Sequence, residues 1–324
     1  MPVLFFASLR SLVGKTAVAV AVGQRLGDDG YSLRLARLAT AEPDEGAQAD
    51  ARCFASLSVS AQKMDHPVSL DDVAKLAKET RSSADVLIVE LPAALSPAEV
   101  IREANGVVVL VERCADLAVD QVAALQKNLG PALAGLVVTA VPRARTAAIG
   151  EGLAEKGVTA LGLLPEDRLL ASPSIGEMAD ALEAEMLFGD GRGEEVIERL
   201  TIAPISADPG QDYFARLGHQ AVVVRCDKPD LQLAALNADS RCLILSGGRL
   251  PLGYVTERAE AEGVPLLITA KGTVAALEAL EGLYFRSRFG PGKAERIGQL
   301  AAEHLDYEKL RQSLGLQRKR RRGK

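Results

Sequence analysis

The sequence predicts an α/β protein with two domains built on parallel sheets, the first resembling a P-loop nucleotide-binding domain and the second smaller. Apolar runs of strand length alternate with helical segments along most of the 324 residues. A Gly-Lys-Thr tripeptide at residues 14–16 lies between a strand and a helix, and a Gly-rich charged segment at 189–195 separates the two halves. The length exceeds what one small core requires.

In the first half, short apolar runs are typical of buried parallel strands, which consist mainly of aliphatic residues. We expect strands at residues 3–7, 32–38, 86–89, 106–111, 135–138 and 159–163. Helices are expected between them at residues 16–26, 46–57, 70–81, 117–127 and 144–156. Ser69, followed by Asp71 and Asp72, is an N-cap signal for the third helix. Strands that alternate with helices predict right-handed crossovers and a parallel sheet.

The second half repeats this alternation. Strands are expected at the end of 196–205 and at 221–225, 242–245 and 266–269, and helices at 212–217, 231–237, 254–262, 274–280, 291–304 and 307–314. The predicted division is therefore a first domain at 1–188, a linker at 189–195, a second domain with terminal helices at 196–314 and a basic tail at 315–324.

The charge balance argues against nucleic acid as the main ligand. The net charge is −5 although six basic residues lie within 318–324, so the rest of the chain is clearly acidic. We expect the tail to be disordered and solvated; contact with RNA, DNA or anionic lipid is the alternative. The four Cys form no C-x-x-C pair and lie far from the three His, so no zinc site is expected.

The chain contains no apolar stretch of about 20 residues, the length needed to span a bilayer. Its first apolar run, residues 2–7, is too short for a signal peptide and lacks a charged lead. We therefore expect a cytoplasmic protein with no membrane span.

The segment at residues 8–16 has the context of a phosphate-binding loop, because a strand precedes it and a helix follows it. Lys15 is expected to contact the β- and γ-phosphates of ATP, and the Thr16 hydroxyl to ligate Mg²⁺. Ser11, Gly14 and Ala17 are the remaining candidates for cofactor contact; Gly14 would let the backbone approach the ligand closely.

Two leucines depart from the loop pattern. Leu9 stands where the full pattern has Gly, and Leu12 occupies another position that is often Gly. Leucine disfavours positive φ and places a side chain where backbone would face the ligand. The alternative is therefore an inherited loop that only caps its helix.

An acidic partner for Mg²⁺ is expected at the end of a later buried strand. Glu90 directly follows the apolar run 86–89 and fits this role as a catalytic and metal-binding candidate. The alternative is an acid exposed at a strand end. Asp85 precedes the strand and is interpreted as a cap or surface residue.

Several segments resemble a known family. The most specific is residues 161–177, which reads LGLLPEDRLLASPSIGE, followed by Asp227-Lys228, residues 230–236 and residues 245–248. The first half resembles dethiobiotin synthetase and, more closely, the N-terminal P-loop region of long phosphotransacetylases. The second half resembles the DRTGG domain that follows this region there.

This resemblance implies roles for further residues. Arg37 stands where relatives have a Lys near the reacting phosphate, and it becomes a third catalytic candidate with Lys15 and Glu90. Thr139 stands where relatives have an Asn that helps to hold the base. The resemblance also implies a ligand-sensing second domain and a homodimer. Acetyl transfer is not expected, because the chain ends soon after the second domain.

In the second domain, polar and glycine residues follow predicted strands, where open α/β sheets bind ligands. A Gly-Gly pair there permits close backbone approach to a small anion or nucleotide, but a tight turn is the equal alternative. Asp227 is either a ligand contact or a helix cap. The candidate residues are Asp227, Lys228, Ser246, Gly247, Gly248 and Thr273.

Three functions are compatible with these features. The leading hypothesis is an ATP-binding regulator with weak or no catalysis, in which the P-loop domain is coupled to a ligand-sensing domain. The second is an ATP-dependent ligase or carboxylase, with Lys15, Arg37 and Mg²⁺ stabilising charge. The third is an interaction protein whose P-loop is vestigial.

Overall fold

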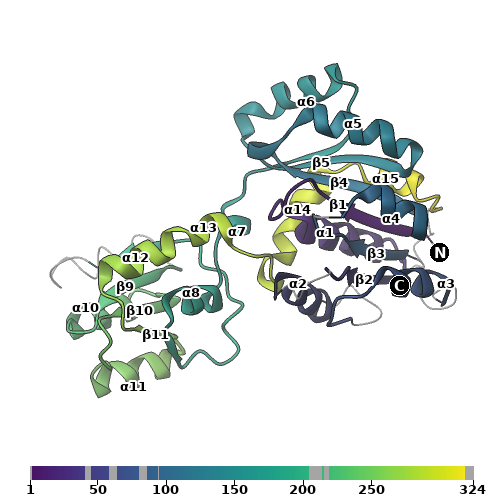
Figure 1. The fold of residues 1–324 in the computed structure, drawn as a ribbon. Helices are drawn as coiled ribbons and strands as arrows, with labels where there is room; N and C mark the ends of the chain where they lie inside the picture. The colour runs from purple at the N-terminus through teal and green to yellow at the C-terminus, as the bar shows by residue number, and fades with distance from the viewer. Residues whose placement is uncertain are drawn as a thin grey trace. The chain divides into compact units, whose positions relative to one another are not determined.

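The computed structural model describes residues 2–40, 45–57, 64–79, 86–93, 95–203, 214 and 219–317. Two compact units divide the chain: residues 1–167 together with 289–324 form the first, and residues 168–288 form the second. Each unit has its own sheet with helices packed against it (Figure 1). The predicted α/β class with two sheets is confirmed.

The first unit contains a six-stranded sheet of order β2-β3-β1-β4-β5-β6 in which all neighbouring strands are parallel. The strands are β1 (Val3–Ala7), β2 (Leu33–Arg37), β3 (Val86–Glu90), β4 (Val107–Arg113), β5 (Leu133–Val141) and β6 (Ala160–Pro165). The connections from β1 and from β4 leave toward opposite edges of the sheet. The carboxyl ends of β1 and β4 are therefore a topological switch point, where such sheets bind ligands.

Helices cover both faces of this sheet (Figure 1). Alternate strand side chains, among them Phe5, Val89 and Leu110, pack with α3 to α6 in one buried cluster, and α1 packs on the opposite face against β1 and β3. The helices are α1 (Lys15–Asp28), α2 (Glu45–Ser56), α3 (Leu70–Glu79), α4 (Pro97–Ala104), α5 (Val119–Leu129) and α6 (Thr146–Glu155). Short 3₁₀ turns are η2 (Cys114–Asp116), η3 (Gly130–Ala132) and η4 (Arg143–Arg145).

The C-terminal helices belong to the first unit and not, as predicted, to the second. After η5 (Pro291–Lys293), α14 (Ala294–His304) packs its buried Ile297 and Leu300 face against α1 and β6. The Asp306 N–H donates to the Leu161 carbonyl at 2.8 Å, just before α15 (Tyr307–Ser313). The predicted boundary was wrong because sequence proximity does not reveal which sheet an amphipathic helix covers.

The second unit contains a five-stranded sheet of order β7-β11-β10-β9-β8, in which β7 is antiparallel to β11 and the other pairs are parallel. The strands are β7 (Glu185–Leu187), β8 (Leu200–Ile202), β9 (Ala221–Arg225), β10 (Cys242–Ser246) and β11 (Leu266–Thr269). The helices are α7 (Arg168–Ala171), α8 (Ile175–Leu182), α10 (Pro229–Leu236), α11 (Gly253–Glu262), α12 (Thr273–Glu281) and α13 (Leu283–Arg286).

Two buried clusters hold this second sheet. Val222, Val224 and Leu245 face α10 and α11, whereas Val223 and Ile244 face α8 and α12. The alternation of these neighbours along each strand is that of a sheet covered on both faces.

The expected linker at 189–195 is part of the second unit. The Gly176 N–H donates to the Gly193 carbonyl at 2.8 Å, and Arg192 forms an ion pair with Glu195. Glycine and charge at this point make a turn after an edge strand, which the sequence pattern alone does not distinguish from a linker.

Some predicted elements lie outside the described residues. These are the helix at 212–217 apart from Phe214, the end of the helix at 70–81, and the basic tail from residue 318 onward. In the described part of the chain, no helix combines the length and the apolar character needed to cross a bilayer.

Candidate phosphate-binding site

The loop after β1 leads directly into the N-terminus of α1. Gly14 is the N-cap residue with φ 90°, a left-handed conformation that only glycine adopts without cost. No side chain caps the helix, and its first turn contains no acidic residue. The Val18 N–H donates to the Gly14 carbonyl at 3.1 Å, so the amides of residues 15–17 have no acceptor within the helix. This end of a 14-residue helix therefore favours an anion.

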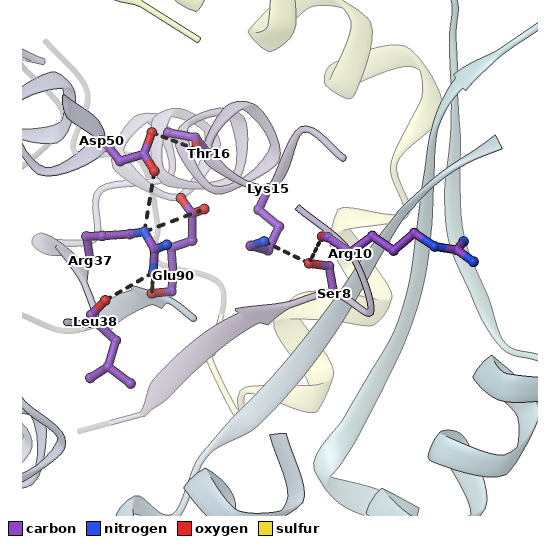
Figure 2. Close-up of polar contacts among 8 residues, drawn as sticks. All are labelled: Ser8, Arg10, Lys15, Thr16, Arg37, Leu38, Asp50 and Glu90. Carbon is purple, nitrogen blue, oxygen red and sulfur yellow. Dashed lines mark hydrogen bonds and ion pairs between the residues drawn. The ribbon is translucent and has the colours of Figure 1, made fainter. Parts of the chain in front are cut away.

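Lys15 is buried at this helix start, with 6% of its surface exposed. Its Nζ donates to Ser8 Oγ at 2.7 Å, and Ser8 Oγ donates in turn to the Arg10 carbonyl at 2.6 Å (Figure 2). Burial lowers the pKa of Lys15, while the carboxylate of Glu90 acts to raise it. The ammonium is thus held inside the loop by Ser8, a residue that the sequence analysis did not single out.

Leu9 and Leu12 differ in their surroundings. Leu12 adopts φ 58° and its side chain is 60% exposed. Leu9 packs instead against the core of the first unit, and its N–H donates to Glu112 Oε1 at 2.5 Å. The expected cost of positive φ at Leu12 is therefore present, about 1–2 kcal/mol for a non-glycine residue.

Arg37, from the end of β2, is fixed between acidic and carbonyl oxygens (Figure 2). Its Nε lies 3.3 Å from Asp50 Oδ2 and 4.0 Å from Glu90 Oε1. Its Nη1 donates to the carbonyls of Leu38 and Glu90 at 3.1 and 3.2 Å. Asp50, on α2, also accepts a hydrogen bond from Thr16 Oγ1 at 3.4 Å.

Glu90 is buried, so the alternative of an acid exposed at a strand end is wrong. Its Oε2 has no hydrogen-bond partner within the described residues. The pKa of Glu90 is raised to about 7, chiefly by burial and also by the negative Asp50, while Arg37 and Lys15 oppose the change. A buried carboxylate oxygen without a partner is costly and is typical of a site that a ligand completes.

The oxygens of Thr16, Asp50 and Glu90 are hard donors of the kind that Mg²⁺ prefers. In the part of the chain that the structure describes, no group of three or more His, Cys, Asp or Glu side chains could hold a metal ion. A Mg²⁺ here would thus take its remaining ligands from phosphate and water, as is usual for this ion. The unpartnered Glu90 Oε2 fits that donor set.

Thr139 lies beneath the loop. Its hydroxyl donates to the Val13 carbonyl at 2.7 Å, and the Glu112 carbonyl lies 3.4 Å away. The hydroxyl predicted to hold a base is therefore already used to support the backbone before Gly14. Of the other predicted contacts, Ser11 is exposed and Ala17 is half-buried at the first turn of α1.

In the second unit, the predicted residues lie at the carboxyl ends of β9, β10 and β11. Asp227 accepts two hydrogen bonds from Arg225, at 2.9 and 2.6 Å, and this pairing lowers the pKa of its carboxyl. The cap of α10 is Lys228, without a side-chain bond, so the interpretation of Asp227 as a cap is wrong. Ser246 Oγ and Thr273 Oγ1 lie 2.9 Å apart.

The Gly-Gly pair forms a tight turn. The Gly247 N–H donates to the carbonyls of Thr269 and Lys271, and the Gly248 N–H donates to Thr269 at 2.9 Å. Their φ angles of 104° and 71° explain why both positions are glycine. Because both amides are bonded within the protein, an anion at this edge would be bound by other groups.

Comparison with known proteins identifies the second unit. Residues 177–283 match the family model of the DRTGG domain. The second unit contains a DRTGG domain. Phosphate acetyltransferase of Nitratidesulfovibrio vulgaris is 26% identical over 164 residues, which cover 47% of this chain and 23% of the relative. The chain therefore spans about a quarter of that relative's length. The predicted resemblance to phosphotransacetylases with a DRTGG domain is confirmed.

Solved structures with similar folds include MinD cell division proteins and a regulatory region with CBS and DRTGG domains. The MinC:MinD cell division complex of Aquifex aeolicus is 12% identical, with 52% of this chain and 83% of that chain covered and a TM-score of 0.40. MinD of Pyrococcus horikoshii, complexed with Mg-ADP, is 15% identical with 52% and 83% covered and a TM-score of 0.35. The regulatory CBS and DRTGG domains of Clostridium perfringens pyrophosphatase, complexed with diadenosine tetraphosphate, are 14% identical with 42% and 62% covered and a TM-score of 0.31.

Proposed function

We propose that this chain is a nucleotide-binding regulatory protein, in which the first unit binds ATP with Mg²⁺ and the DRTGG domain binds a small effector. The observation that carries the proposal is the buried Lys15 at the uncapped N-terminus of α1, close enough to Glu90 to feel its charge, together with a Glu90 Oε2 that has no hydrogen-bond partner within the described residues. A helix start, an ammonium and hard oxygen donors together match a phosphate–Mg²⁺ unit.

The roles follow from these positions. Lys15 contacts the terminal phosphates, and the free amides of the first turn of α1 donate to phosphate oxygens. Thr16, Asp50 and Glu90 supply oxygens to Mg²⁺ or to its water shell. Catalysis is weak or absent in this proposal, because Arg37 is held by Asp50 and by two carbonyls and has little freedom to follow a reacting phosphate.

The test is calorimetry of ATP–Mg²⁺ on the full chain and on Lys15→Ala. We expect binding by the wild type and at least a tenfold weaker affinity for the variant. Lys156→Ala is the matched control. Lys156 is an exposed lysine at the C-terminus of α6, just before β6, so it lies at the amino ends of the strands, away from the phosphate loop. Wild-type protein that binds neither ATP–Mg²⁺ nor inorganic triphosphate–Mg²⁺ would refute the proposal.

The proposed effector site lies at the edge of the second sheet formed by Ser246, Thr273 and the loop at 247–252. A screen of phosphate-bearing compounds by melting temperature tests it, since binding to the folded state alone must raise that temperature. We expect a compound whose effect persists in Lys15→Ala and is lost in Thr273→Val. If every stabilising compound instead acts through Lys15, the effector role of this unit is refuted.

The ligase alternative predicts phosphate release from ATP in the presence of a carboxylate substrate. Release above background that requires Lys15 and Arg37 would favour it over a regulator.

The interaction-protein alternative predicts that nucleotides do not change the melting temperature. The homodimer that the resemblance implies predicts twice the chain mass of 34.2 kDa in light scattering.

A further inference from the structure

Glu112 is a second buried acid beside the phosphate loop, and nothing above gives it a role. It lies next to the end of β4, at the switch point between β1 and β4, and none of its surface is exposed. Its Oε1 accepts the Leu9 N–H at 2.5 Å. Its Oε2 has no hydrogen-bond partner within the described residues.

A carboxylate in this position is unfavourable by itself. Burial raises the pKa of Glu112, and the nearby Asp116 acts in the same direction. The Leu9 amide, Arg10 and Lys15 oppose that change. An apolar residue would avoid the burial of an unpartnered oxygen, so what Glu112 contributes is its contact with the loop.

That contact completes a pair of anchors for the loop. Glu112 holds the loop at its start through the Leu9 amide, and Thr139 holds it at its end through the Val13 carbonyl. The anchors come from the neighbouring strands β4 and β5. Between them the backbone passes through Leu12 at positive φ, and Gly14, directly after the second anchor, is also at positive φ; such a conformation needs support from outside the loop.

We propose that Glu112 is a positioning residue that fixes the phosphate loop through the Leu9 amide, and that its negative charge at the same time weakens the binding of phosphate. This inference rests on the proposed nucleotide site. The two effects act on affinity in opposite directions, and side-chain chemistry separates them. Glutamine retains an acceptor for Leu9 and removes the charge, whereas alanine removes both.

The experiment measures the Kd of ATP–Mg²⁺ at pH 8 for the wild type, Glu112→Gln and Glu112→Ala. We expect Glu112→Gln to bind about tenfold tighter, which corresponds to about 1.4 kcal/mol of binding free energy. Glu112→Ala should bind more weakly than Glu112→Gln because its loop is no longer anchored. Asp116→Asn is the control: it removes an exposed negative charge four residues further along, and its affinity should stay near that of the wild type.

The pH dependence of the affinity distinguishes an effect of the Glu112 charge from a purely structural role. As the pH falls, the wild-type Glu112 gains a proton and the affinity ratio between Glu112→Gln and the wild type should shrink toward one. The groups that face Glu112, which are Arg10, Lys15 and Asp116, are present in both proteins. Glu90 also titrates in both proteins, so its effect cancels in the ratio.

Each outcome tests one part of the proposal. If Glu112→Gln binds no tighter than the wild type, or the ratio is independent of pH, the effect of charge is refuted. If Glu112→Ala binds as tightly as Glu112→Gln, the positioning role is refuted. Should Glu112→Ala fail to fold, Thr139→Val removes the other anchor without a change of charge, and unchanged affinity in that variant overturns the anchoring. If the wild type binds no nucleotide or triphosphate, the proposed function itself fails; if it binds through Lys15 while all Glu112 variants equal it, only this inference fails.

Discussion

Glu90→Gln gives the sharpest test of the electrostatics of the site. Glu90 is buried beside Asp50, Arg37 and Lys15, and its pKa is raised to about 7, chiefly by burial. The variant keeps the size of the side chain and can accept a hydrogen bond, but it carries no charge at any pH. Any difference in pH dependence between the two proteins therefore reports the ionisation of Glu90.

The magnitude follows from the two pKa values. In the unfolded chain the carboxyl titrates near its ordinary value of 4.5, and in the folded protein near 7. Between these values the folded state binds more protons than the unfolded state, so the stability of the wild type falls as the pH rises through this window. The loss amounts to roughly 3 kcal/mol and is complete above pH 7. Below pH 4.5 both states are protonated and no loss remains.

The assay is urea unfolding of the full chain, followed by circular dichroism from pH 4.5 to pH 8. Relative to the wild type, Glu90→Gln should gain roughly 3 kcal/mol of unfolding free energy across this range. The control is Glu103→Gln on α4, which replaces an exposed carboxylate that is solvated in both states. A difference between Glu90→Gln and the wild type that is flat across this range, or that grows toward acid, would contradict the reasoning.

The remaining predictions concern local backbone and caps. Leu12→Gly should raise the unfolding free energy by up to about 1 kcal/mol in thermal unfolding, because it relieves positive φ at an exposed side chain; a clear loss would contradict this. Ser174→Ala should lower it by about 1 kcal/mol, since the Ser174 and Glu177 side chains form a reciprocal capping box on α8, and an unchanged midpoint would count against that role. Asp306→Ala should cost a similar amount, about 1 kcal/mol, by removing the cap bond to the Lys309 amide of α15; stability equal to the wild type would show that the cap contributes nothing.

The sheets of both units could be predicted because buried parallel strands leave a strong local signal. The runs at 86–89, 106–111 and 221–225 are nearly pure aliphatic sequence. The first two cover most of β3 and β4, and the third coincides with β9. The assignment of α14 and α15 to a unit could not be predicted in this way. Their apolar faces indicate only that they pack against something, and the partner, α1 with β6, lies more than 100 residues away in sequence.

The candidate site likewise contains residues that a local sequence pattern reveals and residues whose place depends on packing between distant segments. Lys15 and Thr16 belong to a recognisable loop, and in the structure they lie near Arg37 and Glu90 (Figure 2). Asp50 carried no signal, because its approach to Thr16 depends on how α2 packs beside β2. Glu112 did carry one: like Glu90, it is an acid directly after a buried aliphatic run, and the same rule applied to β4 would have found it.

The charges of the site constrain what it can bind. Lys15 and Arg37 supply two positive charges, whereas Asp50, Glu90 and Glu112 carry three negative charges when fully ionised, and all five side chains are largely removed from water. A phosphate added to that arrangement meets these acids close to the ammonium, and their repulsion is poorly screened at such burial. A Mg²⁺ ion bound there would offset this repulsion with its two positive charges, and Thr16, Asp50 and Glu90 would supply oxygens to it or to its water shell. On the proposed function, we therefore expect the acids around Lys15 to favour ATP bound to Mg²⁺ over ATP without the metal.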